Sequence, residues 1–132
     1  MIMEPQVIRY EFNGKQYQCP IELAVSLFSG KWKTTIICKL MEGKKRYGEL
    51  KKLIVGINHK MLAEQLRELE DAGIISREVY PVVPPKVEYE LTELGEQLKP
   101  AIQLLQQWGR QFQIPVSVDS QSPVSAQFSA DR

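Results

Sequence analysis

The stretch from Asn58 to Gly73, N-H-K-M-L-A-E-Q-L-R-E-L-E-D-A-G, predicts a helix with marked ends and two different faces. Asn58 is a favourable N-cap, because its side-chain oxygen can accept from the free N–H groups of the first turn. Gly73 suits the left-handed residue that closes a helix. Leu62, Leu66 and Leu69 recur at helical spacing, so we expect them to form a buried stripe.

The opposite face of this helix changes character along its length. Basic and hydrogen-bonding side chains come first and acids follow: His59, Lys60, Ala63, Glu64 and Arg67, then Glu68, Glu70 and Asp71. A helix N-terminus that is basic and carries free N–H groups can approach the phosphates and base edges of DNA. A solvated amphipathic helix would show the same pattern, so the neighbouring segments must decide.

Charge is unevenly distributed along the chain. The 132 residues suit a single globular domain, with 43% hydrophobic and 25% charged residues and a net charge of +1. Residues 31–60 nevertheless hold nine Lys or Arg against two acids, whereas residues 61–112 hold five against nine. A basic block directly before the helix is typical of a nucleic-acid-binding surface. A lysine-rich surface that binds nothing is the other interpretation.

The sequence lacks the motifs that are typical of membrane proteins, metal sites and several classes of enzyme. No apolar run approaches the ~18 residues of a membrane span and no leader opens the chain, so we expect a cytoplasmic protein with no membrane partner. Cys19 and Cys38 form no CxxC pair, and with a single histidine they predict reduced thiols and no metal site. No phosphate-binding loop, nucleophile elbow or carboxylate pair is present, which predicts neither a cofactor nor catalysis.

The segments before the helix predict a hairpin and three shorter helices. Asn13-Gly14 lies between two short apolar and aromatic runs, which is a strong hairpin signal. Pro20 fits the first turn of a helix that ends at Gly30 and has these apolar positions inward: Ile21, Ala24, Leu27 and Phe28. The remaining predictions are a helix from Lys33 to Met41, a connection at 44–46, and a helix from Tyr47 to Leu53 with Leu50 and Leu53 inward.

The segments after Gly73 predict a two-stranded ribbon and a long helix. K-V-E-Y-E-L alternates strictly, placing Val87, Tyr89 and Leu91 on one face, and a proline-rich tip separates it from the strand I-I-S-R-E-V-Y. Thr92 caps the last helix, and Pro100 should kink this helix. Its apolar stripe consists of Leu94, Leu98, Ile102, Leu105, Trp108 and Phe112. Two helices joined by a short turn with glycine, here Tyr47–Leu53 and the Asn58 helix, predict a helix-turn-helix.

From Cys19 to about Phe112 the chain resembles the HxlR family of bacterial transcription regulators. The matching pieces occur in order: Cys19-Pro20-Ile21-Glu22, Gly30-Lys31-Trp32-Lys33, Arg46-Tyr47-Gly48-Glu49-Leu50, Ile57-Asn58-His59-Lys60-Met61-Leu62, Leu66-Arg67-Glu68-Leu69-Glu70 and Val83-Pro84-Pro85-Lys86-Val87-Glu88-Tyr89. The family usually has Ser or Thr in place of Asn58 and commonly Phe in place of Tyr47. Both changes preserve the local chemistry.

The resemblance implies an α+β winged helix-turn-helix that is mainly α with a two-stranded β-wing. It also implies a homodimer that binds double-stranded DNA at a palindromic operator. The residues expected nearest base edges are His59, Lys60, Ala63 and Arg67, with Asn58 opening the recognition helix. Those expected nearest phosphates are Arg46, Tyr47, Lys51, Lys52 and Lys86.

The last helix has more large apolar groups than one small domain covers easily, so we expect it to form the dimer interface. A helix that only closes the monomer is the alternative. The expected contact residues are Leu98, Ile102, Leu105, Trp108 and Phe112. Some relatives of the family use a cysteine at the position of Cys19 as a thiol switch, which a helix N-terminus could favour. Cys19 is therefore the candidate sensor for an electrophile or other small effector, and a quiet thiol is the alternative.

The sequence thus predicts an N-terminal hairpin extension at 1–18, a DNA-binding domain at 19–112 and a flexible tail at 113–132. The predicted function is a transcription regulator, with repression as the expected sign. A winged helix that binds an acidic protein instead of DNA is the alternative. A cysteine-dependent enzyme using Cys19 fits poorly, because the single histidine is distant in sequence and offers no obvious base.

Overall fold

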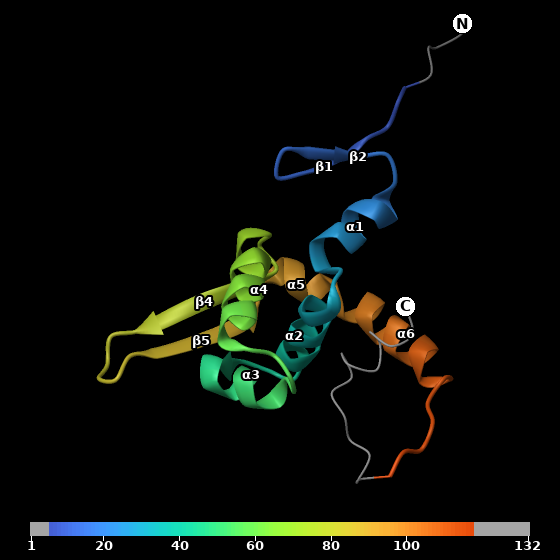
Figure 1. The fold of residues 1–132 in the computed structure, drawn as a ribbon. Coiled ribbons are helices and arrows are strands. Elements are labelled where there is room, and N and C mark those ends of the chain that lie inside the picture. Colours follow the sequence, from blue (N-terminus) through green and yellow to red (C-terminus); the bar gives the residue numbers. More distant parts are fainter. Residues whose placement is uncertain (1–5, 118–132) are drawn as a thin grey trace, which may run out of the picture.

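The computed structural model describes residues 6–117, in which helices and short strands alternate along the chain (Figure 1). The elements in order are β1 Tyr10–Phe12, β2 Lys15–Tyr17, α1 Pro20–Phe28, α2 Lys31–Met41, β3 Lys45–Arg46, α3 Tyr47–Leu53, α4 His59–Asp71, β4 Ile75–Tyr80, β5 Lys86–Leu91, α5 Glu93–Gln97 and α6 Lys99–Arg110.

Helix α4 is built as its sequence predicts. The Asn58 side chain accepts from the backbone N–H of Met61 at 2.7 Å, which caps the first turn. Gly73 has a φ of 77°, the left-handed conformation that ends the helix. Leu62, Leu66 and Leu69 are all buried. The stripe therefore anchors α4 and leaves its opposite face outward.

One hydrophobic core lies beneath α4. Fully buried side chains from α2, α3 and the start of β4 pack against the leucine stripe: Ile36, Ile37, Leu50, Ile74 and Ile75. Lys33 of α2 also forms an ion pair with Glu68 of α4 at 2.9 Å. Because α2 braces α4 through both contacts, the outward face of α4 has a rigid base.

The wing is a sheet of three antiparallel strands in the order β3-β5-β4. Strands β4 and β5 form the expected ribbon, with Arg77 opposite Tyr89 and Tyr80 opposite Lys86. Residues 44–46 were expected to form only a connection, and this was wrong, because Lys45 and Arg46 pair with Tyr89 and Glu88 of β5. Two residues are too few to show the alternating pattern of a strand, so the sequence gives no local signal for β3. Its pairing depends on a distant strand, β5.

The N-terminal hairpin is confirmed. Strands β1 and β2 pair with Tyr10 opposite Tyr17, and Asn13 and Gly14 both have positive φ, at 48° and 80°, as a two-residue hairpin turn requires. Tyr17 is buried, and its hydroxyl accepts from Ser26 of α1 at 3.0 Å. The hairpin is thus attached to α1, and Figure 1 shows it above that helix.

The last helix is divided. One kinked helix was expected, but α5 ends at Gln97 and α6 begins at Lys99. Thr92 caps α5 as expected, accepting from the N–H of Gly95 at 3.1 Å. Pro100 lies in the first turn of α6, where a missing N–H costs no hydrogen bond. The proline therefore starts a new helix.

Three local expectations are corrected. Helix α2 begins at Lys31, two residues earlier than predicted. Ile21 and Leu53 were expected inward but are 70% and 43% exposed. The predicted flexible tail falls largely on residues 118–132, which lie outside the described part. No helix within residues 6–117 has the length and apolar character to cross a membrane.

Candidate nucleic-acid interface

The residues expected nearest base edges lie together on the outward face of α4. His59, Lys60, Ala63 and Arg67 are all exposed, on the side opposite the buried leucines. Asn58 is also exposed, but its oxygen is engaged by the Met61 N–H. Asn58 therefore fixes the start of α4, and the three polar side chains that follow it, of His59, Lys60 and Arg67, are free to approach a groove.

Tyr47, at the first position of α3, holds the first residue of α4. The two aromatic rings of Tyr47 and His59 stack with centroids 5.9 Å apart and planes inclined by 12°. The Tyr47 hydroxyl lies 3.2 Å from Nδ1 of His59 and donates to the His59 backbone oxygen at 3.2 Å. Tyr47 was expected near phosphates, but its one hydroxyl hydrogen is donated to the backbone of a base-edge candidate instead.

Arg46 and Lys86 are brought together around Glu88, an acid that sequence reasoning left out of the site. The Glu88 carboxylate lies 3.5 Å from Lys86, 3.9 Å from Lys44 and 4.0 Å from Arg46. The register of β3 against β5 explains this cluster, since Arg46 pairs with Glu88. The alternation of apolar and charged residues along β5 predicts which face of the strand carries Glu88. No local pattern predicts that Glu88 lies next to Arg46.

Tyr80 completes this charged cluster. A hydrogen bond from Tyr80, followed by the nearby Lys86 and Lys44, lowers the pKa of Glu88 despite a smaller opposing effect of burial. The same hydrogen bond, together with burial and nearby acids, raises the pKa of Tyr80 to about 12. The Lys86 ammonium also lies 4.7 Å from the Tyr80 ring centroid. Glu88 therefore stays ionised and keeps the wing cations in place.

An open groove runs between the wing and the start of α3. It encloses about 600 Å³ and is lined by the following residues: Arg46, Tyr47, Gly48, Arg77, Val82, Val83, Pro84, Pro85, Lys86, Val87 and Tyr89. Three of these are cations, so the groove suits an anionic backbone. Arg77 was missed from sequence because it lies among exposed residues of β4 and shows no motif of its own.

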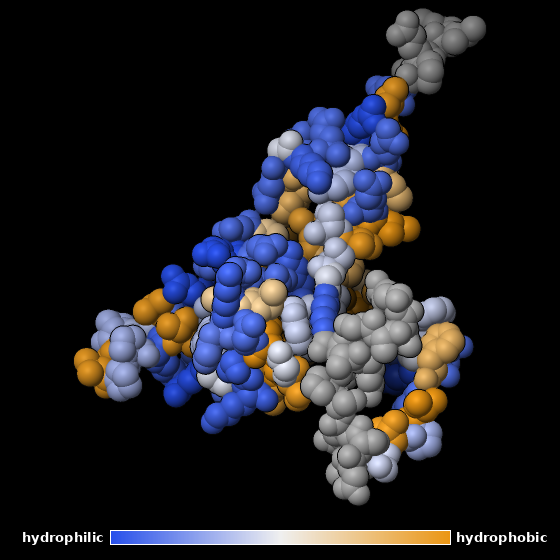
Figure 2. Space-filling view, viewed as in Figure 1, coloured by the Kyte–Doolittle hydropathy of each residue, from blue (hydrophilic) through white to orange (hydrophobic). Residues whose placement is uncertain are grey.

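The two lysines of α3 lie in its last turn, next to the connection that leads to α4. Lys52 is exposed and Lys51 is half-buried. Figure 2 shows the surface around α3 and α4 as largely hydrophilic, whereas apolar residues gather near the wing tip and along the segment after α6. At the wing the two kinds of surface meet, because the groove that holds Arg46 and Lys86 is also lined by Val82 and Val83.

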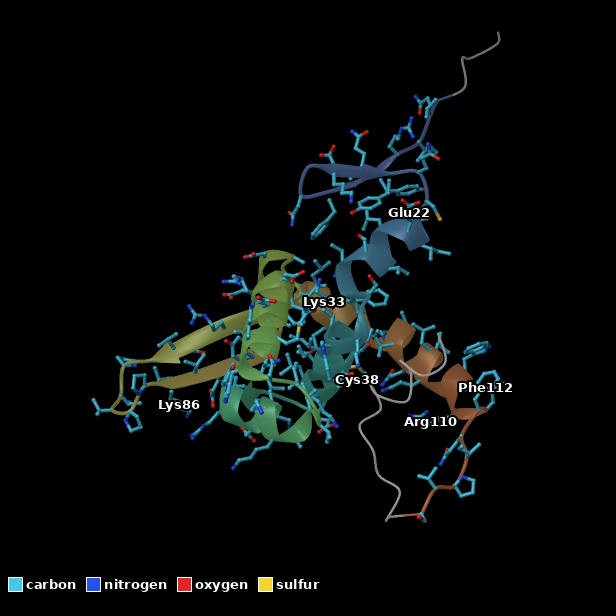
Figure 3. All side chains as sticks on the ribbon, in the orientation of Figure 1. Glu22, Lys33, Cys38, Lys86, Arg110 and Phe112 are labelled. Atoms are coloured by element: carbon cyan, nitrogen blue, oxygen red, sulfur yellow. The ribbon has the colours of Figure 1, made fainter. Side chains whose placement is uncertain are left out.

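The expected dimer residues divide into two groups. Leu105, Trp108 and Phe112 are 56%, 64% and 63% exposed, and the rings of Trp108 and Phe112 lie 5.1 Å apart. Figure 3 shows Phe112 directed away from the core at the end of α6. Ile102, in contrast, is buried in the core of the same subunit, and Leu98 is half-buried and packs against that core. Ile102 is therefore removed from the interface set.

The two cysteines have different environments. Cys19 is exposed at the N-cap position of α1. Cys38 is half-buried on α2, where Gln106 of α6 donates to its sulfur at 3.4 Å, and burial raises the pKa of its thiol. Figure 3 shows Cys38 between α2 and α6. Within residues 6–117, no cluster of three or more His, Cys, Asp or Glu could hold a metal ion.

Comparison with known proteins links this geometry to a family. The family model described as HxlR-like helix-turn-helix matches residues 27–116. YkvN of Bacillus subtilis strain 168, named an HTH-type transcriptional regulator, is 52% identical over 95 residues, which cover 72% of this chain and 80% of YkvN.

Two solved structures share the fold. The redox regulator HypR in its oxidised form is similar with a TM-score of 0.68 and 43% identity, over 74% of this chain and 100% of HypR. The diamide-treated transcriptional regulator YodB of B. subtilis is similar with a TM-score of 0.61 and 46% identity, over 74% of this chain and 97% of YodB. The expected winged helix-turn-helix fold is thereby confirmed.

Proposed function

Because the chain belongs to the HxlR-like helix-turn-helix family, we propose that it regulates transcription by placing the outward face of α4 in the major groove of an operator. The observation that supports this most is the exposure of His59, Lys60 and Arg67 on a helix whose other face is fixed in the core. These side chains can form hydrogen bonds with base edges, and Lys60 and Arg67 suit guanine in particular.

Phosphate contacts would come from elements on both sides of α4. Arg46 and Lys86 line the groove beside the wing, while Lys51 and Lys52 extend the basic surface along α3. Contacts of this kind fix the position of a protein on the duplex without reading its sequence. The wing would lie along the backbone next to the groove that α4 enters.

We further propose that the active form is a homodimer on a palindromic operator. Leu105, Trp108 and Phe112 expose a large apolar surface that a second copy could cover. A twofold dimer presents two α4 helices to two half-sites, which explains why a palindrome would be bound. A dimer seated on a promoter would exclude polymerase, and repression is the sign of regulation we propose.

Cys19 supports a second level of function, a response to oxidants or electrophiles. Its thiol is exposed at the N-cap position of α1, where an oxidant or electrophile can reach it. Two solved relatives are a redox regulator and a regulator treated with diamide. Diamide accepts two hydrogen atoms from two thiols and joins the sulfurs as a disulfide, so it would lower operator affinity if Cys19 is the sensor. The Cys19→Ser variant should keep its affinity after diamide treatment.

The experiment that tests DNA binding is a salt titration with a labelled duplex from upstream of the gene. Each phosphate contact releases counterions, so the logarithm of affinity should fall linearly with the logarithm of salt concentration, with a slope of about 0.9 per contact. Lys52→Ala should reduce that slope by roughly two contacts, one from each subunit of the proposed dimer. Lys15→Ala, which removes another exposed lysine, on the hairpin, should leave the slope unchanged.

A flat salt dependence would contradict phosphate binding. It would favour instead a winged helix that binds an acidic protein through the same basic surface. A slope that responds to Lys15→Ala as strongly as to Lys52→Ala would mean that the charge of the whole protein, rather than this surface, attracts DNA.

A further inference from the structure

The contact between Tyr47 and His59 joins the start of α3 to the start of α4. Tyr47 is half-buried and packs against the core, whereas His59 is exposed. Besides the stacked rings, two polar contacts converge on one Tyr47 oxygen, at 3.2 Å from His59 Nδ1 and 3.2 Å from the His59 carbonyl oxygen. Tyr47 is therefore held in place by the core, and its contacts set the orientation of the His59 ring.

Counting hydrogens assigns the direction of both contacts. A tyrosine hydroxyl has one hydrogen and can also accept, whereas a carbonyl oxygen can only accept. Both contacts are hydrogen bonds only if Tyr47 donates to the His59 carbonyl and Nδ1–H donates to Tyr47. In the reverse arrangement Tyr47 would donate to Nδ1, and its oxygen would face the carbonyl oxygen with no hydrogen between them. The first arrangement satisfies every atom involved.

This assignment decides what His59 offers to a partner. A neutral imidazole has one nitrogen that donates and one that accepts. With Nδ1 as the donor, Nε2 becomes an acceptor. Within residues 6–117, the His59 ring has no other hydrogen-bond or ion-pair partner, so Nε2 remains available on the outward face of α4.

We propose that the Tyr47 hydroxyl is a positioning group that holds His59 as its Nδ1–H tautomer and directs Nε2 outward as a hydrogen-bond acceptor. His59 then selects a base that carries an amino group on its major-groove edge, which is N6 of adenine or N4 of cytosine. Guanine offers only acceptors there, and thymine an acceptor and a methyl group. The base preference rests on the proposed function, but the tautomer does not.

The tautomer is measured on the free protein. A long-range ¹H–¹⁵N correlation spectrum reports which imidazole nitrogen carries the proton, and His59 is the only histidine, so its signals need no assignment. At a pH well above the ordinary pKa of histidine side chains, we expect a protonated Nδ1 in the wild type. Tyr47→Phe keeps the ring but loses the hydroxyl, and should shift the proton towards Nε2.

The matched control is Tyr17→Phe, which removes a hydroxyl that contacts only α1. Its spectrum should equal that of the wild type. A wild-type proton on Nε2, or a Tyr47→Phe spectrum identical to the wild type, would overturn the inference. A change in fold would not mimic the expected result, because the amide spectrum of the same sample reports folding separately.

The base preference is tested by selecting bound duplexes from a random library. Wild type should enrich adenine or cytosine at one position of each half-site, and Tyr47→Phe should reduce that preference by about fivefold, as for one hydrogen bond. Enrichment of guanine or thymine there would overturn the base assignment. If no sequence is enriched, the proposed function fails and the base assignment with it, while the spectrum still decides the tautomer.

Discussion

Lys60 is the residue at which the sequence, the fold and the proposed interface agree most closely. It follows His59 on the exposed side of α4, and the described structure shows no ion pair for it. Its ammonium is therefore free to bind guanine O6 and N7, the acceptors that lysine prefers in the major groove. The acids near the end of α4, Glu68, Glu70 and Asp71, follow it by roughly two to three helical turns.

Lys60→Ala should weaken operator binding by about 1–3 kcal/mol. The physical reason is the loss of a base-edge contact, which has no substitute in the shortened side chain. Anisotropy titrations at fixed salt measure the effect, with Lys15→Ala as a control of equal charge. An operator affinity that Lys60→Ala leaves unchanged would exclude Lys60 from the interface.

Glu88 forms ion pairs with several cations of the wing and a hydrogen bond with Tyr80. The hydrogen bond between them raises the pKa of Tyr80 to about 12. The stability that this hydrogen bond gives to the folded state is fully present below a pH of about 10, the pKa of tyrosine in the unfolded chain. It is lost as the pH rises through about 12, the pKa of Tyr80 in the folded protein. The wing should therefore keep its charged cluster throughout the neutral range.

Glu88→Gln should lower the pKa of Tyr80, because it removes the charged acceptor that opposes ionisation of the phenol. An ultraviolet titration at alkaline pH, compared with Tyr80→Phe to identify the signal, measures the change among the five tyrosines of the chain. If Tyr80 ionises at the same pH with and without the Glu88 carboxylate, the hydrogen bond is not the cause of the shift.

At the scale of elements, the junction between β4 and α5 depends on a glycine. The backbone N–H of Thr92 donates to the Ile74 carbonyl oxygen at 3.0 Å, which draws α5 against the start of β4. Gly95 is buried at this approach, and a Cβ there would overlap the same carbonyl oxygen. Only a residue without a side chain allows the two elements to meet so closely.

Gly95→Ala should destabilise the protein by about 1–3 kcal/mol, the usual cost of overpacking. The matched control is Gly109→Ala in α6, where an added Cβ meets nothing within 4 Å. This control should be neutral or slightly stabilising, because alanine favours a helix. Urea unfolding of both variants measures the difference, and equal stabilities would contradict the close approach at Gly95.

What the sequence could predict depends on how local each feature is. The Asn58 cap, the leucine stripe and the Asn13-Gly14 turn were predicted because each rests on residues within one or two turns. Strand β3 and the Glu88 cluster were not, because they depend on pairing with β5 across the sheet.

The burial of Ile102 was missed for a related reason. Periodicity identified one apolar stripe on the last helix, but it does not show which part of a wide stripe faces the core. Within α6, Ile102 lies in the core, whereas Leu105 and Trp108 remain exposed. Their roles at the interface and those of the DNA-facing residues stay predictions, since each concerns a partner rather than the fold.

At the scale of the whole molecule, the exposed apolar surface of α6 supports the proposed homodimer. Leu104 is 65% exposed beside Leu105 and Trp108, and Ile21 and Val25 of α1 are exposed as well. At about 25 cal/mol per Å² of apolar surface buried, covering this area gives a substantial driving force for association. The proposed symmetry of the operator follows from that association.

Trp108→Glu should convert the dimer into a folded monomer and weaken operator binding sharply, because each subunit would then bind one half-site alone. Gln103→Glu is the control, since it adds the same charge to an exposed polar position of α6. Light scattering at micromolar concentration gives the mass, and circular dichroism checks folding. A wild-type protein that is already monomeric, or a Trp108→Glu variant that stays dimeric, would contradict this interface.

The decisive measurement is footprinting of the purified protein on DNA from upstream of its own gene and from fragments selected for binding. We expect protection of an inverted repeat whose half-sites lie about one helical turn, or a multiple of it, apart. The protection should disappear when His59 and Lys60 are both changed to alanine in a protein that still folds. If no discrete site is protected on any fragment, or if the double variant protects the same site equally well, then α4 does not read an operator.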